Sequence, residues 1–348
     1  MNTIKIGKKT IGYHRPCFII AEAGVNHNGQ YELAKKLVDV AITAGADAVK
    51  FQTYTTEGLV TKEITIAEYA KHNIGRDMRQ IDMLKQYELS HEEFTKLKKY
   101  CDTKNILFLS TPHSFDAIDF LENLVPAYKF GSGDITNIPA LEYAAKKGKP
   151  MILGTGMSTL EEVRSAVQAI TSVGNTDIIA LHCTTNYPCP LEEVNLRAML
   201  TLQSELDCLV GYSDHTIGLL VPAIAVALGA SVIEKHFTFD KKLPGPDHRA
   251  SLEPADLRQM VVNIRNVEKA LGVPEKKPVP SEYEIMQQVR KSVVAGQDIK
   301  KGSRIQREML QVKRPGTGLS PADMHKLVGK KTKQDIMKDE MIQLDMVE

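Results

Sequence analysis

Short apolar segments alternate with longer amphipathic segments eight times between residues 18 and 272. The series begins with FIIAEAG at 18–24 and YELAKKLVDVAITAG at 31–45, and it ends with SVIEKHF at 231–237 and PADLRQMVVNIRNVEKALG at 254–272. Short runs rich in Val, Ile and Phe are typical of buried strands, whereas apolar residues three or four positions apart are typical of helices. Eight parallel strand–helix units in about 250 residues predict an α/β fold, the (β/α)8 TIM barrel.

A doubly wound parallel sheet is the alternative fold for such an alternation. It usually has fewer strands and a glycine-rich nucleotide loop at the end of its first strand. The sequence contains neither a GxGxxG nor a GxxxxGK motif. The barrel is therefore the favoured prediction.

Other segments flank or interrupt the barrel pattern. Residues 3–13 predict a small hairpin that acts as a lid on one end of the domain, and the polar insertion 56–88 predicts an active-site loop or lid. Residues 273–284 contain three prolines and predict a linker between a barrel domain at 1–272 and a small β-rich domain at 285–348. A domain of that size is marginally stable alone, so we expect it to dock on a barrel.

Net charge, the length of apolar runs and the cysteine pattern limit which partners and which cellular compartment the sequence predicts. The net charge of +1 on 348 residues gives no argument for binding nucleic acid or an anionic membrane. The apolar runs are far below membrane-spanning length, and residues 1–20 lack the apolar core of a signal peptide. The five cysteines are odd in number and have no CxxC spacing, which indicates reduced thiols and a cytoplasmic protein.

Polar residues stand at the end of almost every predicted strand. Barrel active sites lie at this C-terminal face, and a purely structural barrel would not need polar groups at all eight strand ends. The pattern therefore predicts an enzyme. The residues concerned are Glu22, Lys50, Gln52, Ser110, Thr111, Lys129, Ser132, Asp134, Thr155, His182, Thr184, Ser213, Asp214, His215 and His236.

Two histidines are the strongest candidates for metal ligands. His215 and His236 end neighbouring strands that are separated by a predicted helix at 219–229, so their imidazoles should converge. Ligation by histidine and oxygen suits Mn²⁺, Co²⁺ or Mg²⁺ more than structural zinc, and it leaves positions open for a substrate carbonyl. The alternative is that each histidine is a hydrogen-bonded structural residue.

Two lysines indicate an anionic substrate. Lys50 and Lys129 stand among hydroxyls and glycines (GSG at 131–133, GTG at 154–156), a setting that suits a phosphate or carboxylate. The residues alone therefore predict a metal-dependent enzyme that acts on a small anion and a carbonyl compound. The alternatives are buried structural ion pairs for the lysines, a Schiff-base aldolase, a metal-dependent hydrolase, or a non-catalytic carbohydrate- or ice-binding protein.

With these residues in place, the sequence resembles the sialic acid synthase family, which includes N-acetylneuraminate, legionaminate and pseudaminate synthases. The resemblance covers nearly the whole chain, and the C-terminal part, including VKRPGTG at 312–318, resembles the antifreeze-like (SAF) domain of these enzymes. The motifs that carry it are AEAGVNHNG (21–29), VKFQT (49–53), LSTP (109–112), YKFGSGD (128–134), TGMST (155–159), LHCTTNYP (181–188), GYSDHT (211–216), EKHFT (234–238) and PGPDHRASLEP (244–254).

The resemblance implies a reaction. The family condenses phosphoenolpyruvate with the open-chain aldehyde of N-acetylmannosamine and water, giving N-acetylneuraminate and phosphate by C–O cleavage. An alternative substrate is 2,4-diacetamido-2,4,6-trideoxymannose, which gives N,N'-diacetyllegionaminate by the same chemistry.

The resemblance also implies roles for individual residues. His215 and His236 would hold the metal, Mn²⁺ first among the candidates, while Glu22 and Asp134 are the candidates for proton transfer. Arg314 would enter the active site of a partner subunit and meet the N-acetyl group, which implies a domain-swapped homodimer. Phosphoenolpyruvate would be bound by Lys50, Thr111, Lys129, Ser132 and Ser213, and the sugar by Gln52, Tyr187 and Asp247.

Three positions depart from the family pattern. Asp134 stands where many bacterial members have Glu, and Gly154 replaces a common Ser. His113 follows STP where Phe is frequent. The first two departures bear on the detailed roles of the site residues and leave the predicted reaction class unchanged.

Overall fold

The computed structural model describes residues 3–66, 71, 73–74 and 77–348. The chain divides into two compact units, residues 1–272 and residues 273–348. Each unit has a hydrophobic core of its own.

The first unit is built on an eight-stranded parallel sheet with the hydrogen-bonded order β5-β4-β3-β10-β9-β8-β7-β6. The two end strands, β5 and β6, lie side by side, so the sheet curls into a barrel. The predicted TIM barrel is confirmed, and the doubly wound alternative is wrong. The strands are β3 (Phe18–Gly24), β4 (Ala48–Thr53), β5 (Leu107–Pro112), β6 (Tyr128–Phe130), β7 (Met151–Gly154), β8 (Ile178–His182), β9 (Leu209–Asp214) and β10 (Val232–His236).

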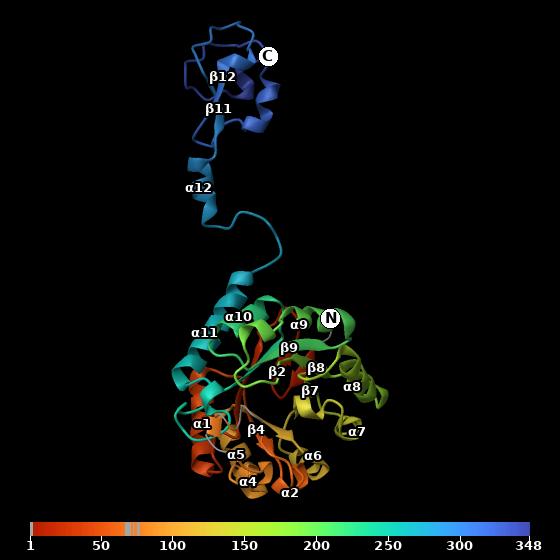
Figure 1. The fold of residues 1–348 in the computed structure, drawn as a ribbon. Coiled ribbons are helices and arrows are strands. Elements are labelled where there is room, and N and C mark those ends of the chain that lie inside the picture. Colours follow the sequence, from red (N-terminus) through yellow and green to blue (C-terminus); the bar gives the residue numbers. More distant parts are fainter. Residues whose placement is uncertain (1–2, 67–70, 72, 75–76) are drawn as a thin grey trace. The chain divides into compact units, whose positions relative to one another are not determined.

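Helices surround the strands of this unit (Figure 1). Thr159 begins one of them with a capping box that includes Glu162, and Gly45 ends another in the left-handed conformation. They are α1 (Tyr31–Ala44), α5 (His91–Lys104), α6 (Phe115–Leu121), α7 (Ile138–Ala145), α8 (Leu160–Ser172), α9 (Arg197–Glu205), α10 (Leu220–Ala227) and α11 (Pro254–Leu271).

Residues 191–206 (LEEVNLRAMLTLQSEL) are one of the eight longer amphipathic segments, and their pattern predicts a helix that is interrupted in the structure. A 3-10 turn at Leu191–Glu193 precedes α9, which begins only at Arg197. Asn195 lies between them with a φ of 46°, in the left-handed region. A residue in this conformation breaks the α-helical path, and the periodic pattern of the segment does not reveal it.

Alternation along each strand decides which side chains face the barrel interior. In β4, Ala48 belongs to the interior cluster, whereas Val49 and Phe51 belong to the cluster between strands and helices. Because successive side chains in a strand point to opposite faces, Lys50 and Gln52 face the interior at the C-terminal end.

The N-terminal hairpin closes the other end of the barrel. Its strands β1 (Ile4–Ile6) and β2 (Lys9–Ile11) are antiparallel. Ile6 and Ile11 are buried in one cluster with the interior residues Phe18 and Leu109. The predicted lid therefore covers the end opposite the polar strand ends.

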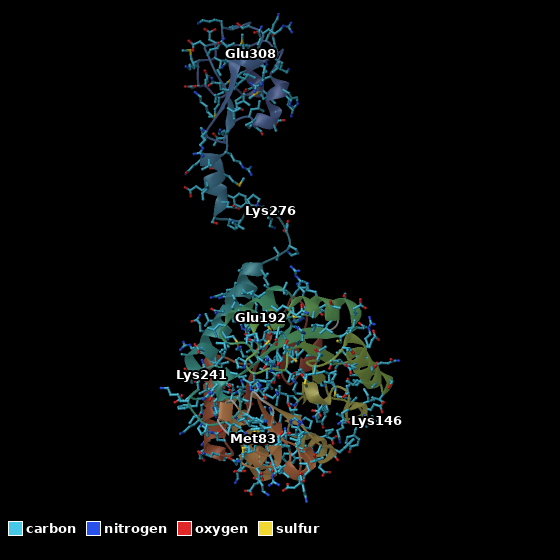
Figure 2. All side chains as sticks on the ribbon, viewed as in Figure 1. Met83, Lys146, Glu192, Lys241, Lys276 and Glu308 are labelled. Atoms are coloured by element: carbon cyan, nitrogen blue, oxygen red, sulfur yellow. The ribbon has the colours of Figure 1, made fainter. Side chains whose placement is uncertain are left out.

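The insertion after β4 forms a small hydrophobic cluster of its own. It includes α2 (Thr56–Leu59) and α4 (Gln80–Leu84). Tyr54 of the barrel packs there with Ile66, Met83 and Leu84, and Met83 is labelled in Figure 2. Residues 67–70, 72 and 75–76 of the predicted insertion lie outside the described residues.

The second unit is small and contains mostly short elements. Helix α12 (Glu282–Val289) begins within the predicted linker and precedes the antiparallel strands β11 (Ser292–Ala295) and β12 (Leu310–Lys313). Its core includes Val293, Ile305 and Leu327. Among the described residues of both units, no helix is long and apolar enough to cross a membrane.

Candidate active site

The C-terminal ends of the barrel strands surround one polar cavity. Most of the predicted site residues line it, and they come from strands far apart in the sequence: Glu22, Lys50, Gln52, Thr111, Lys129, Ser132, Tyr187, Ser213, His215 and His236. The structure therefore brings the predicted anion-binding and metal-binding residues together. His113, Gly131, Gly154, Cys183 and Glu234 complete the lining.

Among the residues to which the family resemblance gives an individual role, three lie outside this lining, as do the strand-end residues Ser110, Thr155, His182, Thr184 and Asp214. Asp134 is in a 3-10 turn after β6, and its Oδ2 lies 3.7 Å from Nδ1 of His113. Oδ2 of Asp247 lies 3.8 Å from Nδ1 of His236. Arg314 belongs to the second unit, directly after β12.

Two lysines and two glutamates form a buried charge cluster in the cavity. Nζ of Lys50 lies 2.9 Å from Oε2 of Glu22 and 3.6 Å from Oε2 of Glu234. Nζ of Lys129 lies 3.5 Å from Oε1 of Glu234. The two positive and two negative charges balance. An anionic ligand that binds the lysines must therefore replace contacts that Glu22 and Glu234 now make to them.

The two glutamates of this cluster differ in their affinity for a proton. Burial raises the pKa of Glu22 to about 7, although Lys50 opposes the shift. Burial also acts on Glu234, but Lys129 and Lys50 together lower its pKa. Burial opposes the charge of Lys50, yet Glu22 and Glu234 raise the pKa of its ammonium group. Glu22 is therefore the member of the cluster that can exchange a proton near neutral pH.

The sequence analysis missed Glu234, which contacts both lysines and accepts a hydrogen bond from Oγ of Ser213 at 2.9 Å. It lies inside β10, two residues before the strand ends at His236. The predicted site rested on polar residues at strand ends, and Glu234 does not stand at one. The alternation within SVIEKHF could have revealed it, because Val232, Glu234 and His236 share the interior face.

The two histidines have the geometry to share a ligand. Their ring centroids lie 5.7 Å apart. Nδ1 of His215 lies 2.6 Å from the carbonyl oxygen of Thr184, so a proton on Nδ1 leaves Nε2 as a lone-pair donor. Nδ1 of His236 is buried, and it has no hydrogen-bond partner among the described residues. Burial lowers the pKa of both imidazoles, which keeps them in the neutral form that binds metals.

These two residues fit a divalent metal that takes its other ligands from substrate or water. Within the described part of the chain, no three His, Cys, Asp or Glu side chains are grouped to hold a metal by themselves. A site with two protein ligands keeps most coordination positions open, which suits a Lewis acid more than a structural ion.

A second corner of the cavity is built from small groups. The backbone N–H of Gly156 donates to Oγ of Ser132 at 3.0 Å and to Sγ of Cys183 at 3.1 Å. A Cβ on Gly154 would lie 3.1 Å from the backbone nitrogen of Ser132. The glycine therefore lets the loop after β6 approach β7 closely, and a serine there would displace Ser132.

Comparison with known proteins identifies the family. Residues 37–276 match the NeuB family, and residues 290–348 match the SAF domain. The chain belongs to the NeuB family. It is 47% identical over 335 residues to the N,N'-diacetyllegionaminic acid synthase of Legionella pneumophila, a match that covers 95% of this chain and 94% of that protein.

Other members of the NeuB family extend the comparison. The N-acetylneuraminate-9-phosphate synthase of Homo sapiens is 38% identical, with 97% of this chain and 94% of that protein covered. A crystal structure of N-acetylneuraminic acid synthetase from Leptospira borgpetersenii has a TM-score of 0.72 and 36% identity, covering 82% of this chain and 95% of that one. The protein is therefore an enzyme of the sialic acid synthase type, with the predicted barrel and SAF domain.

Proposed function

We propose that this NeuB-family enzyme condenses phosphoenolpyruvate with the open-chain aldehyde of an N-acetylated mannosamine-type sugar, giving a nine-carbon α-keto acid and phosphate. One observation carries the proposal: two buried lysines and two histidines line the same cavity, and Nδ1 of His236 has no hydrogen-bond partner among the described residues. The lysines suit an anion, and the histidines suit a metal beside a carbonyl oxygen.

Two sugars are candidates for the second substrate. N-Acetylmannosamine would give N-acetylneuraminate, and 2,4-diacetamido-2,4,6-trideoxymannose would give N,N'-diacetyllegionaminate. The higher identity to the Legionella synthase, 47% against 38% for the human one, favours the diacetamido sugar.

Phosphoenolpyruvate would bind at the charge cluster. The ammonium groups of Lys50 and Lys129 would hold its carboxylate and phosphate, with hydroxyl groups of Thr111, Ser132 and Ser213 as further donors. The hydroxyl of Thr111 already lies 3.1 Å from Nζ of Lys50. Charged hydrogen bonds in a site shielded from water give both affinity and orientation.

The sugar would bind on the side of the histidines. The ring of Tyr187 lies 4.1 Å from that of His215 and 5.4 Å from that of His236, measured between centroids. Gln52 and Asp247 would contact the hydroxyl and acetamido groups of the sugar. A Mn²⁺, Co²⁺ or Mg²⁺ ion held by His215 and His236 would supply Lewis-acid polarisation of the aldehyde.

The protein's carboxyl groups would move the protons of the reaction. Carbon 3 of phosphoenolpyruvate adds to the aldehyde, positive charge develops at carbon 2, water adds there, and phosphate leaves as the C–O bond breaks. Glu22 lies beside Lys50 and has its pKa raised to about 7 by burial, so it can exchange a proton during these steps. Asp134, in the turn after β6 and close to His113, would be the second such carboxyl group.

The charge cluster also argues against a Schiff-base aldolase. A lysine nucleophile must lose its proton, which requires a lowered pKa. Glu22 and Glu234 instead raise the pKa of Lys50. Lys129 has Glu234 at 3.5 Å and donates to the carbonyl oxygen of Phe130 at 3.0 Å.

The test is phosphate release from phosphoenolpyruvate with each sugar, before and after treatment with a chelator and then with added Mn²⁺. Sugar-dependent release that is lost with chelator and restored by Mn²⁺ supports the proposal, and the ratio of kcat/KM values names the sugar. Release that ignores the chelator would reject the two-histidine metal site. No release with either sugar would reject the reaction.

A further inference from the structure

A histidine and a carboxylate face each other at the rim of the cavity. His113 follows β5 and Asp134 ends the turn after β6, and Nδ1 of the histidine lies 3.7 Å from Oδ2 of the aspartate. The side chains are 18% and 21% exposed. At this distance they do not form a hydrogen bond, but a small shift on ligand binding would join them, as apo active sites commonly require.

The other ring nitrogen of His113, Nε2, makes no hydrogen bond to the described part of the chain. This nitrogen is buried, and a buried polar atom without a partner destabilises the folded protein. His113 lines the same cavity as Lys50 and Lys129, so a ligand in that cavity is the available source of a partner.

The surroundings hold the ring in place and keep it neutral. The backbone N–H of His113 donates to the carbonyl oxygen of Thr53 at 3.1 Å, and the edge of the Tyr54 ring packs against the imidazole with centroids 6.1 Å apart. Tyr54 is itself fixed by donating from its hydroxyl to the carbonyl oxygen of Leu84 in α4, at 3.1 Å. The charged groups that act on the ring are Asp134, Lys50 and Lys129, and burial with the two lysines lowers the pKa of His113 to about 4.

We propose that His113 is a catalytic base of this enzyme and that Asp134 orients it and stabilises its protonated form. The oxygen of a water molecule forms a bond to carbon 2 of the substrate, and Nε2 of His113 takes the proton released from that water. The proton then passes to the aldehyde-derived oxygen, which becomes a hydroxyl group. The bond from carbon 2 to the phosphate oxygen then breaks with its electron pair leaving on phosphate, while the hydroxyl group on carbon 2 gives its proton to the departing phosphate and becomes the keto oxygen. The inference rests on the proposed function and adds a base to it.

The experiment compares four proteins in the phosphate-release assay: wild type, His113→Ala, Asp134→Asn and the double variant. Each single change should lower kcat by about 100-fold, the usual contribution of a general base, while KM for phosphoenolpyruvate changes less than about threefold. The kcat of the double variant should lie within about threefold of the kcat of the slower single variant. The effects of residues that act as a unit are not additive. Added imidazole should restore at least about tenfold in kcat to His113→Ala but not to Asp134→Asn.

Controls separate catalysis from structure. His91→Ala changes an exposed histidine that stacks on Phe120 in the same unit, and it should leave the rate unchanged with and without imidazole. His113→Asn replaces the imidazole with a polar group and serves if His113→Ala does not fold. It should be as slow as expected for His113→Ala. A His113 variant that folds and keeps a kcat within twofold of wild type would overturn the inference. A double variant whose fold-decrease in kcat equals the product of the two single fold-decreases would also overturn it. Wild-type protein without sugar-dependent release would instead reject the proposed function.

Discussion

The carboxylate of Asp214 and the ammonium group of Lys235 form an ion pair between β9 and β10 in which both side chains are fully buried. The two residues are paired in the register of the strands, and each directly precedes one of the two histidines. Asp214 also accepts from the backbone N–H of Thr216 at 3.0 Å and from the hydroxyl of Tyr212 at 3.1 Å. The pair therefore fixes the two strand ends that carry His215 and His236.

Loss of this pair should weaken metal binding without removing a ligand. We expect Lys235→Met to lower the affinity for Mn²⁺ by about 10- to 100-fold, as for other changes behind metal ligands. Titration calorimetry with Mn²⁺ measures it directly. Lys241→Met is the matched control, because Lys241 lies after β10 and pairs with Asp256 at a partly exposed position. A folded Lys235→Met protein with wild-type Mn²⁺ affinity would contradict the prediction.

Removal of one negative charge from the lysine–glutamate cluster should favour anion binding. In Glu22→Gln the two lysines face only Glu234, so the cluster gains a net positive charge and phosphoenolpyruvate should bind about tenfold more tightly. The same variant should have a lower kcat, since a proton carrier is lost. Binding measured by calorimetry and turnover measured by phosphate release would then move in opposite directions. Lys50→Met should weaken binding, and a fall in affinity for both variants would show that Glu22 contacts the ligand.

The rate of phosphate release should fall in acid. Burial raises the pKa of Asp134 to about 6, so the ionised form is lost as the pH drops through this value. We expect kcat/KM to decrease about tenfold per pH unit below the pKa of the required carboxylate. Asp134→Asn should be slow and should lack this acid limb. If the limb persists in Asp134→Asn, it belongs to another group, for which Glu22 is the first candidate.

Arg314 should act in the active site of a second subunit. We expect Arg314→Ala to raise KM for the sugar by about tenfold or more while KM for phosphoenolpyruvate stays unchanged, because a charged hydrogen bond to one substrate is lost. Arg304→Ala is the control, since Arg304 is an exposed arginine of the same unit that binds the carbonyl oxygen of Gly329.

Mixing subunits tests the exchange directly. The expected domain-swapped homodimer predicts that a mixture of Arg314→Ala and His236→Ala chains regains about one quarter of the wild-type rate at low sugar, because half of its dimers would be mixed and each of these would have one complete site. A mixture that stays as slow as its components would place the arginine in its own subunit's site or outside any site.

The barrel could be predicted because its signal is repeated. Each of the eight strand-like runs, such as AVKFQT and IIALHCT, is weak evidence for one buried parallel strand. Eight such strands, each followed by a helix, are accommodated together in a closed barrel. Asn195, which interrupts the helix expected over 191–206, has no such repetition. Its left-handed backbone is a local event that an amphipathic pattern does not encode.

Site residues at the ends of strands could be predicted from the sequence, whereas Glu234 was missed. His215 and His236 stand at the ends, and the structure places them beside each other. Glu234 lies inside its strand, where a charge is expected to be costly, and its contacts with Lys50 of β4, Lys129 of β6 and Ser213 offset that cost. His113 differs again, because the importance of its ring depends on Asp134, which is brought near it by the closing contact between β5 and β6.

The pairing of the last barrel strand with the first has a consequence for synthesis of the protein. β10 hydrogen-bonds to β3, and His236 lies opposite Glu22 in that register. A nascent chain that has emerged past Lys129 but not yet as far as residue 234 holds Lys50 and Lys129 and lacks Glu234 and His236. We therefore expect a ribosome-bound intermediate short of that point to be inactive, because the cavity is complete only after β10 has paired with β3.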